Sequence, residues 1–403
     1  MSRPEIFLFG FRGFPGVQGG VETHAEHLTP RLVELGFAVT ACARSPYLDP
    51  RAERRWKGVS LLRTWTVRRT AAETVLHSFV CALVAGLRRP QVVHVQGIGP
   101  ALVTPLLRLF GLRVVVTHHG EDYNREKWGW LARTALRLGE ACGMRFAHRR
   151  IVISRSIDNL VAAKYHKSCA VIPNGVVLPE LPRDSDLVTE LGLEPGKYVL
   201  SVGRLVPEKR HLDLLRAFQA ADLPGWKLAL VGSVDHASSY ADHLVLEARR
   251  DPRVVVAGFR SGEALRQLYG HAGVFALPSS HEGLPIALLE AMSYGVPALV
   301  SDIPANLEVV DDPARIFRVG DVPGLSAKLT ALARAGCPDP ALREAMRRAD
   351  VGRYDWDNVA RMTAAIYGEL LGPGSEAVLR PAVPGYGPLP EIASTRISTS
   401  TGG

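Results

Sequence analysis

The fold of this chain is indicated most clearly by YVLSVGRLVPEKRHLDLLRAF, residues 198–218. A short, mostly apolar strand pattern, Tyr198–Val202, leads into a turn that contains glycine and proline. A helical pattern follows at Leu212–Phe218, where apolar residues recur three and four positions apart. A strand joined by a turn to a helix is the repeating unit of a parallel sheet whose faces are covered by helices.

The same rhythm runs through both halves of the chain. The first half has strand patterns at Ile6–Phe9, Ala38–Cys42, Val92–Val95, Val114–Thr117 and Ile151–Ile153, with helical patterns at Val21–Gly36 and Trp128–Arg145. The second half adds strand patterns at Leu228–Val231, Val254–Ala257 and Val274–Leu277, and helical patterns at Glu263–Gly270 and Asp357–Leu371. Two such series predict an α/β protein with two doubly wound, Rossmann-like domains.

The domain boundary is predicted within residues 173–197, which are rich in proline and turn residues. We take residues 1–182 as the N-terminal domain and 183–354 as the C-terminal domain. Residues 373–403 are rich in Pro, Gly, Ser and Thr without periodicity, so a disordered tail is predicted there.

Composition indicates a soluble protein with an anionic partner. The chain has 403 residues, a formal net charge of +8 and a sequence pI of about 9.4, which favour phosphate, nucleic acid or an acidic membrane as partner. Nucleic acid is disfavoured because no recognised binding module accompanies the charge. Five scattered cysteines without C-x-x-C spacing indicate reduced thiols and a cytoplasmic chain. No signal peptide or membrane span is predicted, and the apolar run Val75–Leu87 is interpreted as a buried helix.

Two glutamates lie eight positions apart in HEGLPIALLEAMSYG, residues 281–295. Gly283 permits close approach of the backbone, and Pro285 suits the first turn of a helix whose N-terminal amides could bind a phosphate. Eight helical residues span roughly 12 Å, a plausible distance between the sugar and the ribose of a sugar-diphosphate-nucleoside. Glu282 and Glu290 could then each accept hydrogen bonds from vicinal hydroxyls. The alternative is a loop acid and a solvated helix acid without a ligand.

The basic turn GRLVPEKR, residues 203–210, follows the carboxyl end of a predicted parallel strand, where open α/β sheets bind ligands. Arg204 and Lys209 could both reach a diphosphate from this turn. An exposed basic loop without a ligand is the alternative.

A glycine-rich turn, GFRGFPGVQGGVETH, spans residues 10–24 between the first strand and the first helix. Gly19 and Gly20 could let backbone amides face a phosphate across an interdomain cleft, although a purely structural turn explains them equally well. The turn is longer than a G-x-G-x-x-G dinucleotide fingerprint. The second strand ends near Arg44, without the acid that would bind a ribose hydroxyl.

Two histidines end the apolar strand of VVVTHHGEDYNREKW, residues 114–128. Histidine is the usual group for proton handling near neutral pH, and a strand end followed by glycine can face a cleft. His119 is therefore the first catalytic candidate and His118 the second, against the commoner case of a structural histidine.

No metal site is predicted. The D-x-D sequence at Asp184–Asp186 lies in the boundary segment, does not follow a buried strand, and is interpreted as the N-cap of the helix before Gly192. No His or Cys cluster has zinc spacing in the sequence.

Basic and aromatic residues gather in the first half, which favours either a solvated helix surface or peripheral contact with an anionic membrane. They are Arg51, Arg54, Arg55, Lys57, Arg63, Arg68, Arg69, Arg133, Arg137, Arg145, Arg149 and Arg150, with Trp56, Trp65, Trp128 and Trp130 among them.

The motifs EGLPIALLEAMSYGVPALVSD, GRLVPEK, VIPNGV and GGVETH together resemble the retaining glycosyltransferases of family 4, which have the GT-B fold. The resemblance covers about residues 5–371, and the C-terminal half carries its most specific motifs. The N-terminal stretches are similar to those of bacterial members that build cell-surface polysaccharides, some of which transfer rhamnose. One motif departs from the family, which often has E-G-F-G-L-P where this chain has the shorter H-E-G-L-P.

The resemblance implies that the C-terminal domain binds a nucleotide-diphosphate sugar and the N-terminal domain an acceptor, with helix 355–372 packing back on the N-terminal domain. It implies that Arg204 and Lys209 bind the diphosphate, Glu282 the donor sugar and Glu290 the ribose, while His119 lies near the anomeric carbon. The full set of donor-binding candidates is Gly19, Gly20, Arg204, Lys209, Glu282, Gly283, Leu284, Pro285 and Glu290. It further implies transfer with retention of configuration, without a metal or other cofactor.

The main hypothesis is therefore sugar transfer to a hydroxyl of a saccharide or lipid-linked saccharide, in the cytoplasm or at the inner face of the cell membrane. A nucleotide-sugar epimerase, a nicotinamide-dependent oxidoreductase and a non-catalytic nucleotide-binding partner are the alternatives. The sugar, the base, the acceptor and the oligomeric state are left open by the sequence.

Overall fold

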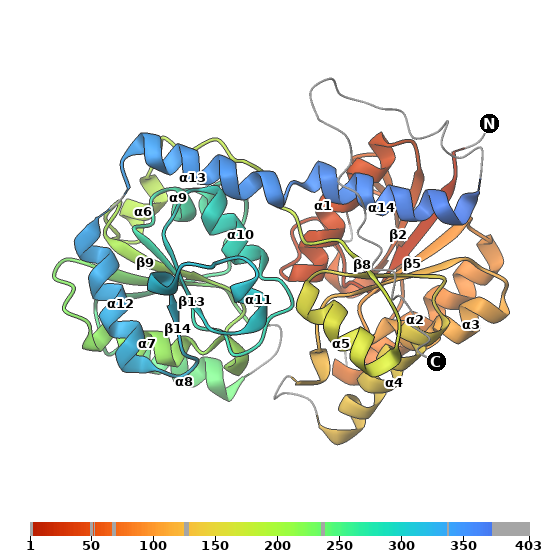
Figure 1. Ribbon diagram of the computed structural model, residues 1–403, viewed down its shortest axis with the longest axis horizontal. Coiled ribbons are helices and arrows are strands. Elements are labelled where there is room, and N and C mark those ends of the chain that lie inside the picture. Colours follow the sequence, from red (N-terminus) through yellow and green to blue (C-terminus); the bar gives the residue numbers. More distant parts are fainter. Residues whose placement is uncertain are drawn as a thin grey trace, which may run out of the picture.

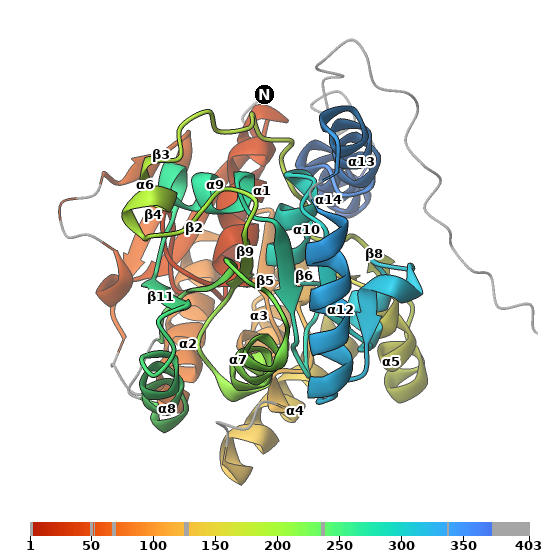
Figure 2. The same cartoon turned by 90° about the vertical axis from the view of Figure 1, so that its left-hand side faces the viewer.

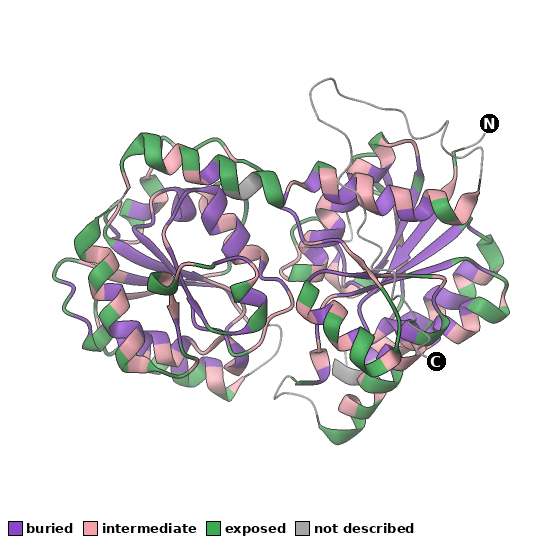
Figure 3. Ribbon diagram, in the orientation of Figure 1, coloured by how far each residue is buried: buried purple, intermediate pink, exposed green. Residues whose placement is uncertain are grey.

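The computed structural model of the chain describes residues 3–48, 51, 53–66, 70–124, 129–234, 238–336 and 338–372. It has two lobes, each built on its own sheet, which lie side by side in Figure 1. In both lobes the strands are buried at the centre and the covering helices expose their outer faces, as Figure 3 shows. The predicted tail, 373–403, lies outside the described residues.

Within the described residues, the N-terminal lobe holds an eight-stranded sheet in the order β3-β4-β2-β1-β5-β6-β7-β8. Its strands are β1 (Glu5–Phe9), β2 (Ala38–Arg44), β3 (Arg55–Trp56), β4 (Val59–Thr64), β5 (Val92–Gln96), β6 (Val114–His118), β7 (Arg149–Val152) and β8 (Ala170–Val171). Only the β3–β4 pair among them is antiparallel. The order reverses between β1 and β5, so the glycine-rich turn after β1 opens at the switch point where such sheets bind ligands.

Helices cover both faces of this sheet. They are α1 (Gly20–Glu34), α2 (Thr70–Arg88), α3 (Thr104–Leu109), α4 (Trp130–Phe146) and α5 (Arg155–Tyr165), together with the last helix of the chain, α14 (Trp356–Leu371). Ile6 and Leu8 of β1 pack in the layer of α1 and α14, whereas Phe7 and Phe9 pack against α2, α3 and α4. This alternation follows from the two-residue period of a strand.

The apolar run Val75–Leu87 forms most of α2, but the expectation that this helix is buried is wrong for one of its faces. Phe79, Leu83 and Leu87 are 43%, 55% and 87% exposed. Their four-residue spacing places them on one side of the helix, opposite the buried Cys81, Ala82 and Ala85. The helix is therefore amphipathic in its environment although its sequence is apolar on both sides.

The second lobe holds, among the described residues, a six-stranded parallel sheet in the order β11-β10-β9-β12-β13-β14. Its strands are β9 (Tyr198–Val202), β10 (Lys227–Val231), β11 (Val254–Gly258), β12 (Val274–Leu277), β13 (Ala298–Ser301) and β14 (Ile316–Phe317). Its helices are α6 (Asp186–Glu190), α7 (His211–Ala220), α8 (Ser239–Ala248), α9 (Gly262–Gly270), α10 (Ile286–Ser293), α11 (Pro304–Leu307), α12 (Val322–Ala335) and α13 (Pro340–Arg353). Figure 2 shows α7, α8 and α12 on one side of the sheet and α9, α10 and α13 on the other.

Short 3-10 turns complete the secondary structure. They are η1 (Ser45–Tyr47), η2 (Pro100–Val103), η3 (Asp122–Asn124), η4 (Pro207–Lys209) and η5 (Pro313–Arg315).

Within the described residues, the chain crosses between the lobes twice. Residues 172–185 lead from β8 into the second lobe, and α13 runs into α14, which returns across the first lobe in Figure 1. The crossings meet where the Val176 N–H donates to the Tyr354 carbonyl at 2.5 Å. Trp356, only 1% exposed, stacks on His27 of α1, and Arg31 Nε donates to Asp357 at 2.6 Å. The last helix thus packs against the N-terminal sheet despite its place in the sequence.

Candidate active site

A cavity of about 380 Å³ lies between the lobes, at the carboxyl ends of the strands of both sheets. It is lined by the turn after β1, the residues after β6, the turn after β9 and the N-terminal part of α10. All the predicted site residues border this cavity: Gly19, Gly20, His119, Arg204, Lys209, Glu282, Gly283, Leu284, Pro285 and Glu290. The fold therefore brings together groups that lie up to 271 positions apart in the sequence (290 minus 19).

Lys209 and Glu282 form an ion pair in the cavity wall. Lys209 Nζ lies 2.5 Å from Glu282 Oε1, and the two side chains are 17% and 11% exposed. Lys209 ends η4, and the left-handed backbone of Arg210 then allows α7 to begin at His211. The Lys209 stem passes over Gly203, where a Cβ would lie 3.5 Å from Lys209 Cε, in ordinary van der Waals contact. A cation and a carboxylate are thus held at adjacent points of one surface.

Glu290 lies in the middle of α10 and has one side in the cavity. The Tyr269 hydroxyl donates a hydrogen bond of 2.9 Å to Oε2 of the Glu290 carboxyl group. Burial raises the pKa of Glu290 to about 7, although the Tyr269 hydrogen bond acts in the opposite direction. Ligand hydroxyls that donate hydrogen bonds to this buried carboxyl group would stabilise its ionised form.

His119 follows β6 and is partly exposed to the cavity. Its Nε2 lies 2.7 Å from Gln96 Oε1, so this nitrogen carries the proton and Nδ1 is left as an acceptor. Burial first, and then the neighbouring histidines His24, His94 and His118, lower the pKa of His119 well below its usual value. The imidazole is therefore neutral at pH 7 and a weak base, which favours a hydrogen-bonding role over proton transfer.

His118, the second histidine candidate, lies outside the cavity lining and is fully buried. Its Nε2 donates to Glu140 Oε1 at 3.0 Å, and its Nδ1 accepts from the Gly120 N–H at 3.1 Å. Burial alone would raise the pKa of Glu140, but hydrogen bonds from His118, Lys164 and Tyr165 lower this pKa to about 2. His118 thus supports the backbone of the turn that carries His119.

Glycines let the two lobes approach each other at the cavity. A Cβ on Gly283 would lie 2.1 Å from the His119 carbonyl oxygen, and one on Gly120 would lie 3.4 Å from Gly283 Cα. On the other side, Gly19 has φ +150°, and a Cβ there would lie 2.1 Å from Glu22 Oε2. A side chain at Gly20 would meet nothing within 4 Å, so the first amides of α1 remain open to the cavity.

Three of the polar side chains that join the lobes, Gln18, Asn174 and Ser233, were not identified from the sequence. Asn174 Nδ2 donates to the Leu284 carbonyl at 2.8 Å, while its Oδ1 lies 3.0 Å from His24 Nδ1. Ser233 Oγ donates to Gln18 Oε1 at 2.8 Å. Asn174 lies in P-N-G, a sequence typical of a simple turn, and only the fold reveals its contact with the loop of Glu282.

Two other sequence motifs lie away from the cavity. Arg44, where a dinucleotide enzyme would have an acid, is 6% exposed and pairs with Glu73 at 3.1 Å. Asp184 and Asp186 lie at the start of α6, outside the cavity lining. The D-x-D sequence does cap this helix, as predicted, but the N-cap residue is its central Ser185, whose side chain makes no capping hydrogen bond.

Comparison with known families follows the two lobes. Residues 18–179 match the family described as Glycosyltransferase Family 4, and residues 187–349 match Glycosyl transferases group 1. Together these matches cover both domains. The chain belongs to the family 4-like glycosyltransferases.

Relatives of this glycosyltransferase agree with that assignment. It is 28% identical over 303 residues to GDP-mannose:cellobiosyl-diphosphopolyprenol alpha-mannosyltransferase of Xanthomonas oryzae, a match that covers 71% of this chain and 76% of the relative. It is 27% identical to glycogen synthase of Mycobacterium tuberculosis, over 90% of this chain and 94% of the relative.

Solved structures show the fold. Sucrose-phosphate synthase of Thermosynechococcus elongatus superposes with a TM-score of 0.75 at 22% identity, covering 91% of this chain and 99% of its own. The Anabaena protein HepE, solved with UDP-glucose, superposes with a TM-score of 0.71 at 17% identity, covering 90% and 98%. The glycosyltransferase therefore has the GT-B architecture of two facing Rossmann-like domains, as the sequence predicted.

Proposed function

We propose that this glycosyltransferase moves a sugar from a nucleotide-diphosphate sugar to a hydroxyl group of an acceptor, with retention of anomeric configuration. The observation that carries the proposal is the interdomain cavity, which presents an adjacent cation and carboxylate at one point and a second carboxylate, Glu290, along α10. HepE, solved with UDP-glucose, supports a nucleotide-sugar donor for this fold.

The Lys209–Glu282 pair fits the junction between a sugar and a phosphate. In a sugar nucleotide the hydroxylated ring is bonded directly to phosphate, so its recognition needs an anion-binding and a hydroxyl-binding group side by side. Lys209 and Glu282 are in that relation at 2.5 Å. Arg204 and the first amides of α10 would bind the rest of the diphosphate, with the Gly19–Gly20 backbone opposite.

Glu290 is assigned to the ribose. A carboxylate that accepts two hydrogen bonds from vicinal hydroxyls regains the solvation that its burial removes. Tyr269 donates to Oε2 of Glu290 and leaves further lone pairs for the ligand.

In the proposed step the bond between the anomeric carbon and the phosphate oxygen breaks, and the acceptor oxygen bonds to that carbon. Negative charge grows on the leaving diphosphate, where Arg204, Lys209 and the α10 amides would stabilise it. Because the lowered pKa of His119 makes its imidazole a weak base and Glu282 is paired with Lys209, the acceptor proton is assigned to the departing phosphate oxygen. Retention requires attack on the face of the leaving group, which puts that oxygen within reach of the hydroxyl. These cations supply the positive charge, so we propose that catalysis needs no metal.

The lobes are held together around the cavity by the Ser233–Gln18 and Asn174–Leu284 hydrogen bonds. Such closure would exclude water from the donor and suppress its hydrolysis.

The proposed acceptor is a saccharide or lipid-linked saccharide, in cell-surface polysaccharide or glycolipid synthesis. The Xanthomonas relative is named for transfer to a cellobiosyl-diphosphopolyprenol.

No helix within the described ranges is both long and apolar enough to cross a bilayer. Helix α4, however, exposes four large apolar side chains by between 50% and 75%: Trp130, Leu131, Leu138 and Phe146. Arg137, between them in the sequence, is also exposed. We propose that this face contacts an anionic membrane from the cytoplasmic side; Arg68, Arg69 and Trp128 lie outside the described residues.

The test begins with a panel of nucleotide sugars measured by thermal shift. The best ligand is then assayed for transfer with lipid-linked and soluble saccharide acceptors, with and without chelator. Transfer with retained configuration supports the proposal, whereas isomerisation of the donor alone would identify an epimerase, which the family comparisons do not favour. A shift with nicotinamide dinucleotides but with no nucleotide sugar would contradict the proposal.

Membrane contact has a separate test. Sedimentation with vesicles of anionic lipid should carry the protein down at low salt, and Leu131→Glu should weaken this by about tenfold or more without reducing transfer to a soluble acceptor. Equal sedimentation of both proteins would refute α4 as the contact face.

A further inference from the structure

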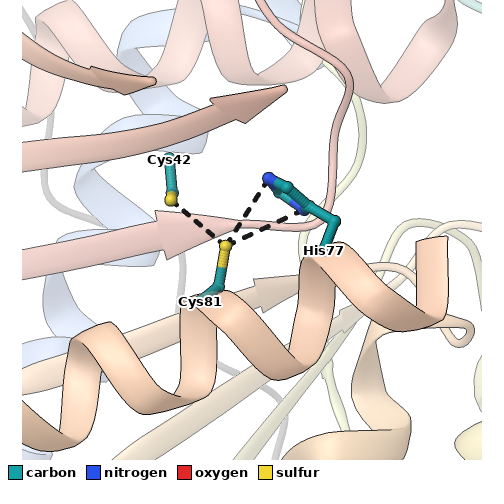
Figure 4. A group of neighbouring side chains, drawn as sticks. All are labelled: Cys42, His77 and Cys81. Atoms are coloured by element: carbon teal, nitrogen blue, oxygen red, sulfur yellow. Dashed lines mark hydrogen bonds between the residues drawn. The ribbon is translucent and has the colours of Figure 1, made fainter. Parts of the chain in front are cut away.

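A buried group of two thiols and an imidazole lies in the core of the N-terminal lobe, and neither the proposed reaction nor the family comparison uses it. Cys42 is on β2, and His77 and Cys81 are one turn apart on α2. Figure 4 shows His77 and Cys81 on one side of the helix, with the Cys81 sulfur directed toward Cys42 on the strand. All three residues are 0% exposed.

The ligand atoms of this group are close together. Cys81 Sγ lies 3.1 Å from Cys42 Sγ and 3.6 Å and 3.8 Å from the two ring nitrogens of His77. One ligand atom from each residue can be chosen so that all lie within 4.8 Å of one another. Among the residues that the structure describes, this is the one group of three or more His, Cys, Asp or Glu side chains that meets this criterion.

His77 is poorly partnered for a buried imidazole. Within the described residues, the polar partner of its ring nitrogens is the Cys81 thiol, which is a weak donor and a weak acceptor. Leaving such a group without a good hydrogen bond costs about 1–3 kcal/mol. An ion bound by the ring nitrogen would remove this deficit, which is the observation that distinguishes the group from an ordinary packed pair of cysteines.

We propose that Cys42, His77 and Cys81 bind a thiophilic divalent cation, Zn²⁺, in a structural site. Bonds of about 2.3 Å to sulfur and about 2.0–2.1 Å to nitrogen at a tetrahedral angle put the ligand atoms roughly 3.6 Å (S to N) and 3.8 Å (S to S) apart. The distance of 3.6 Å between Cys81 Sγ and His77 Nε2 already agrees with this. The two sulfurs must separate by about 0.7 Å, which a small side-chain rotation provides.

The charge balance favours Zn²⁺ over a monovalent ion. Two thiolates, one neutral imidazole and a divalent cation form a neutral group, whereas Cu⁺ would leave a net negative charge in the core. Arg44 and Glu73 form an ion pair nearby, with Nη1 and Oε1 3.1 Å apart. Their charges neutralise each other, so they do not require a net charge on the metal site. The Thr64 hydroxyl, 3.7 Å from Cys42 Sγ, donates to the Ala43 carbonyl at 3.1 Å, so a water is the candidate fourth ligand.

The site would fasten β2 to α2 close to the donor cavity. Two residues after Cys42, the Arg44 N–H donates to the Arg12 carbonyl at 2.7 Å and so supports the glycine-rich turn. Arg12 in turn pairs with Glu22 at 3.1 Å, beside Gly19. Zinc would therefore stabilise the strand end from which this turn is positioned.

The experiment is a metal analysis of the purified full-length protein followed by Co²⁺ titration of the chelated form. The proposal predicts one equivalent of zinc as purified and, with Co²⁺, a thiolate-to-metal charge-transfer band together with the visible bands of a tetrahedral ion. Cys81→Ser should lose the charge-transfer band largely or completely, whereas Cys142→Ser, at a partly exposed free thiol outside the group, should keep it. Chelation should lower the unfolding midpoint of the wild type but not of Cys81→Ser.

The proposal is overturned if the folded wild type takes up no more zinc or Co²⁺ than Cys81→Ser. It is overturned equally if mass spectrometry of freshly purified protein shows a Cys42–Cys81 disulfide. If Cys81→Ser does not fold, metal content and chelator sensitivity of the wild type decide the question, with His77→Gln as the second variant.

Discussion

Replacement of Glu290 by glutamine separates the role of this carboxyl group in ligand binding from its effect on stability. The side chain keeps its shape and can still accept the Tyr269 hydrogen bond, but it can no longer ionise. In the unfolded chain Glu290 titrates near its ordinary pKa of 4.5, whereas burial raises the pKa in the folded protein to about 7. The folded state therefore holds the proton more tightly than the unfolded state does.

The sign and size of the effect follow from this difference. Below pH 4.5 the group is protonated in both states, so its stabilising contribution is fully present; it is lost as the pH rises toward and through 7. A pKa difference of about 2.5 units corresponds to at most about 3.4 kcal/mol at 1.36 kcal/mol per pKa unit. Because Glu290 keeps partial access to solvent, we expect about 1–2 kcal/mol.

The assay is urea unfolding of the wild type and Glu290→Gln between pH 5 and 8.5. The variant should become more stable than the wild type as the pH rises, by about 1–2 kcal/mol at pH 8, with little difference at pH 5. Donor affinity should fall about 10- to 100-fold at pH 8, because a hydrogen bond to a charged group contributes about 1.5–3 kcal/mol. A stability difference that does not change with pH would refute the reasoning.

Three further predictions concern the cavity. Lys209→Ala should reduce kcat at least 100-fold without unfolding the protein, while Arg216→Ala, at an exposed cation of α7, should leave it unchanged; equal activity of the two variants would exclude Lys209 from the site. The pH profile of kcat/KM should show no inflection near 6.5 from His119, whose pKa is well below that value; an inflection that disappears in His119→Asn would contradict the neutral role. Gly283→Ala should impair transfer strongly, because its Cβ would lie 2.1 Å from a carbonyl oxygen, whereas Gly352→Ala, with nothing within 4 Å, should be silent; normal transfer by Gly283→Ala would show that the lobes need not close so tightly.

Much of the fold could be predicted from sequence because its strands are continuous apolar runs. The structure begins and ends β9 and β12 at the predicted residues, Tyr198–Val202 and Val274–Leu277. The strands β3, β8 and β14 are each only two residues long, which is too short for a periodic pattern to show in the sequence. The exposed face of α2 was missed because Phe79, Leu83 and Leu87 are as apolar as the residues that the helix buries.

The site could be predicted in part for a similar reason. Arg204 and Lys209 follow a recognisable strand, and Glu282 precedes a recognisable helix, so topology alone sends them to the same edge of the sheet. Contacts between distant segments could not be predicted. Lys209 and Glu282 pair across 73 positions, and Cys42 meets His77 only because α2 folds back on β2. Such contacts depend on side-chain packing that no local pattern contains.

The same limit applies to the pKa of Glu290. Its neighbours in sequence, Leu289 and Ala291, suggest an apolar setting. The groups that set the pKa, however, are Tyr269 on α9 and the residues of several elements around the cavity, which the local sequence does not contain.

The central claim is that one nucleotide sugar lies along the start of α10, with its sugar and diphosphate at Glu282 and Lys209 and its ribose at Glu290. A crystal structure with the donor identified by the thermal-shift panel tests this most directly. We expect diphosphate oxygens within hydrogen-bond distance of Lys209 and both ribose hydroxyls on the Glu290 carboxylate. A nucleotide bound in the cavity without contact to Glu290, or bound outside it, would contradict the account.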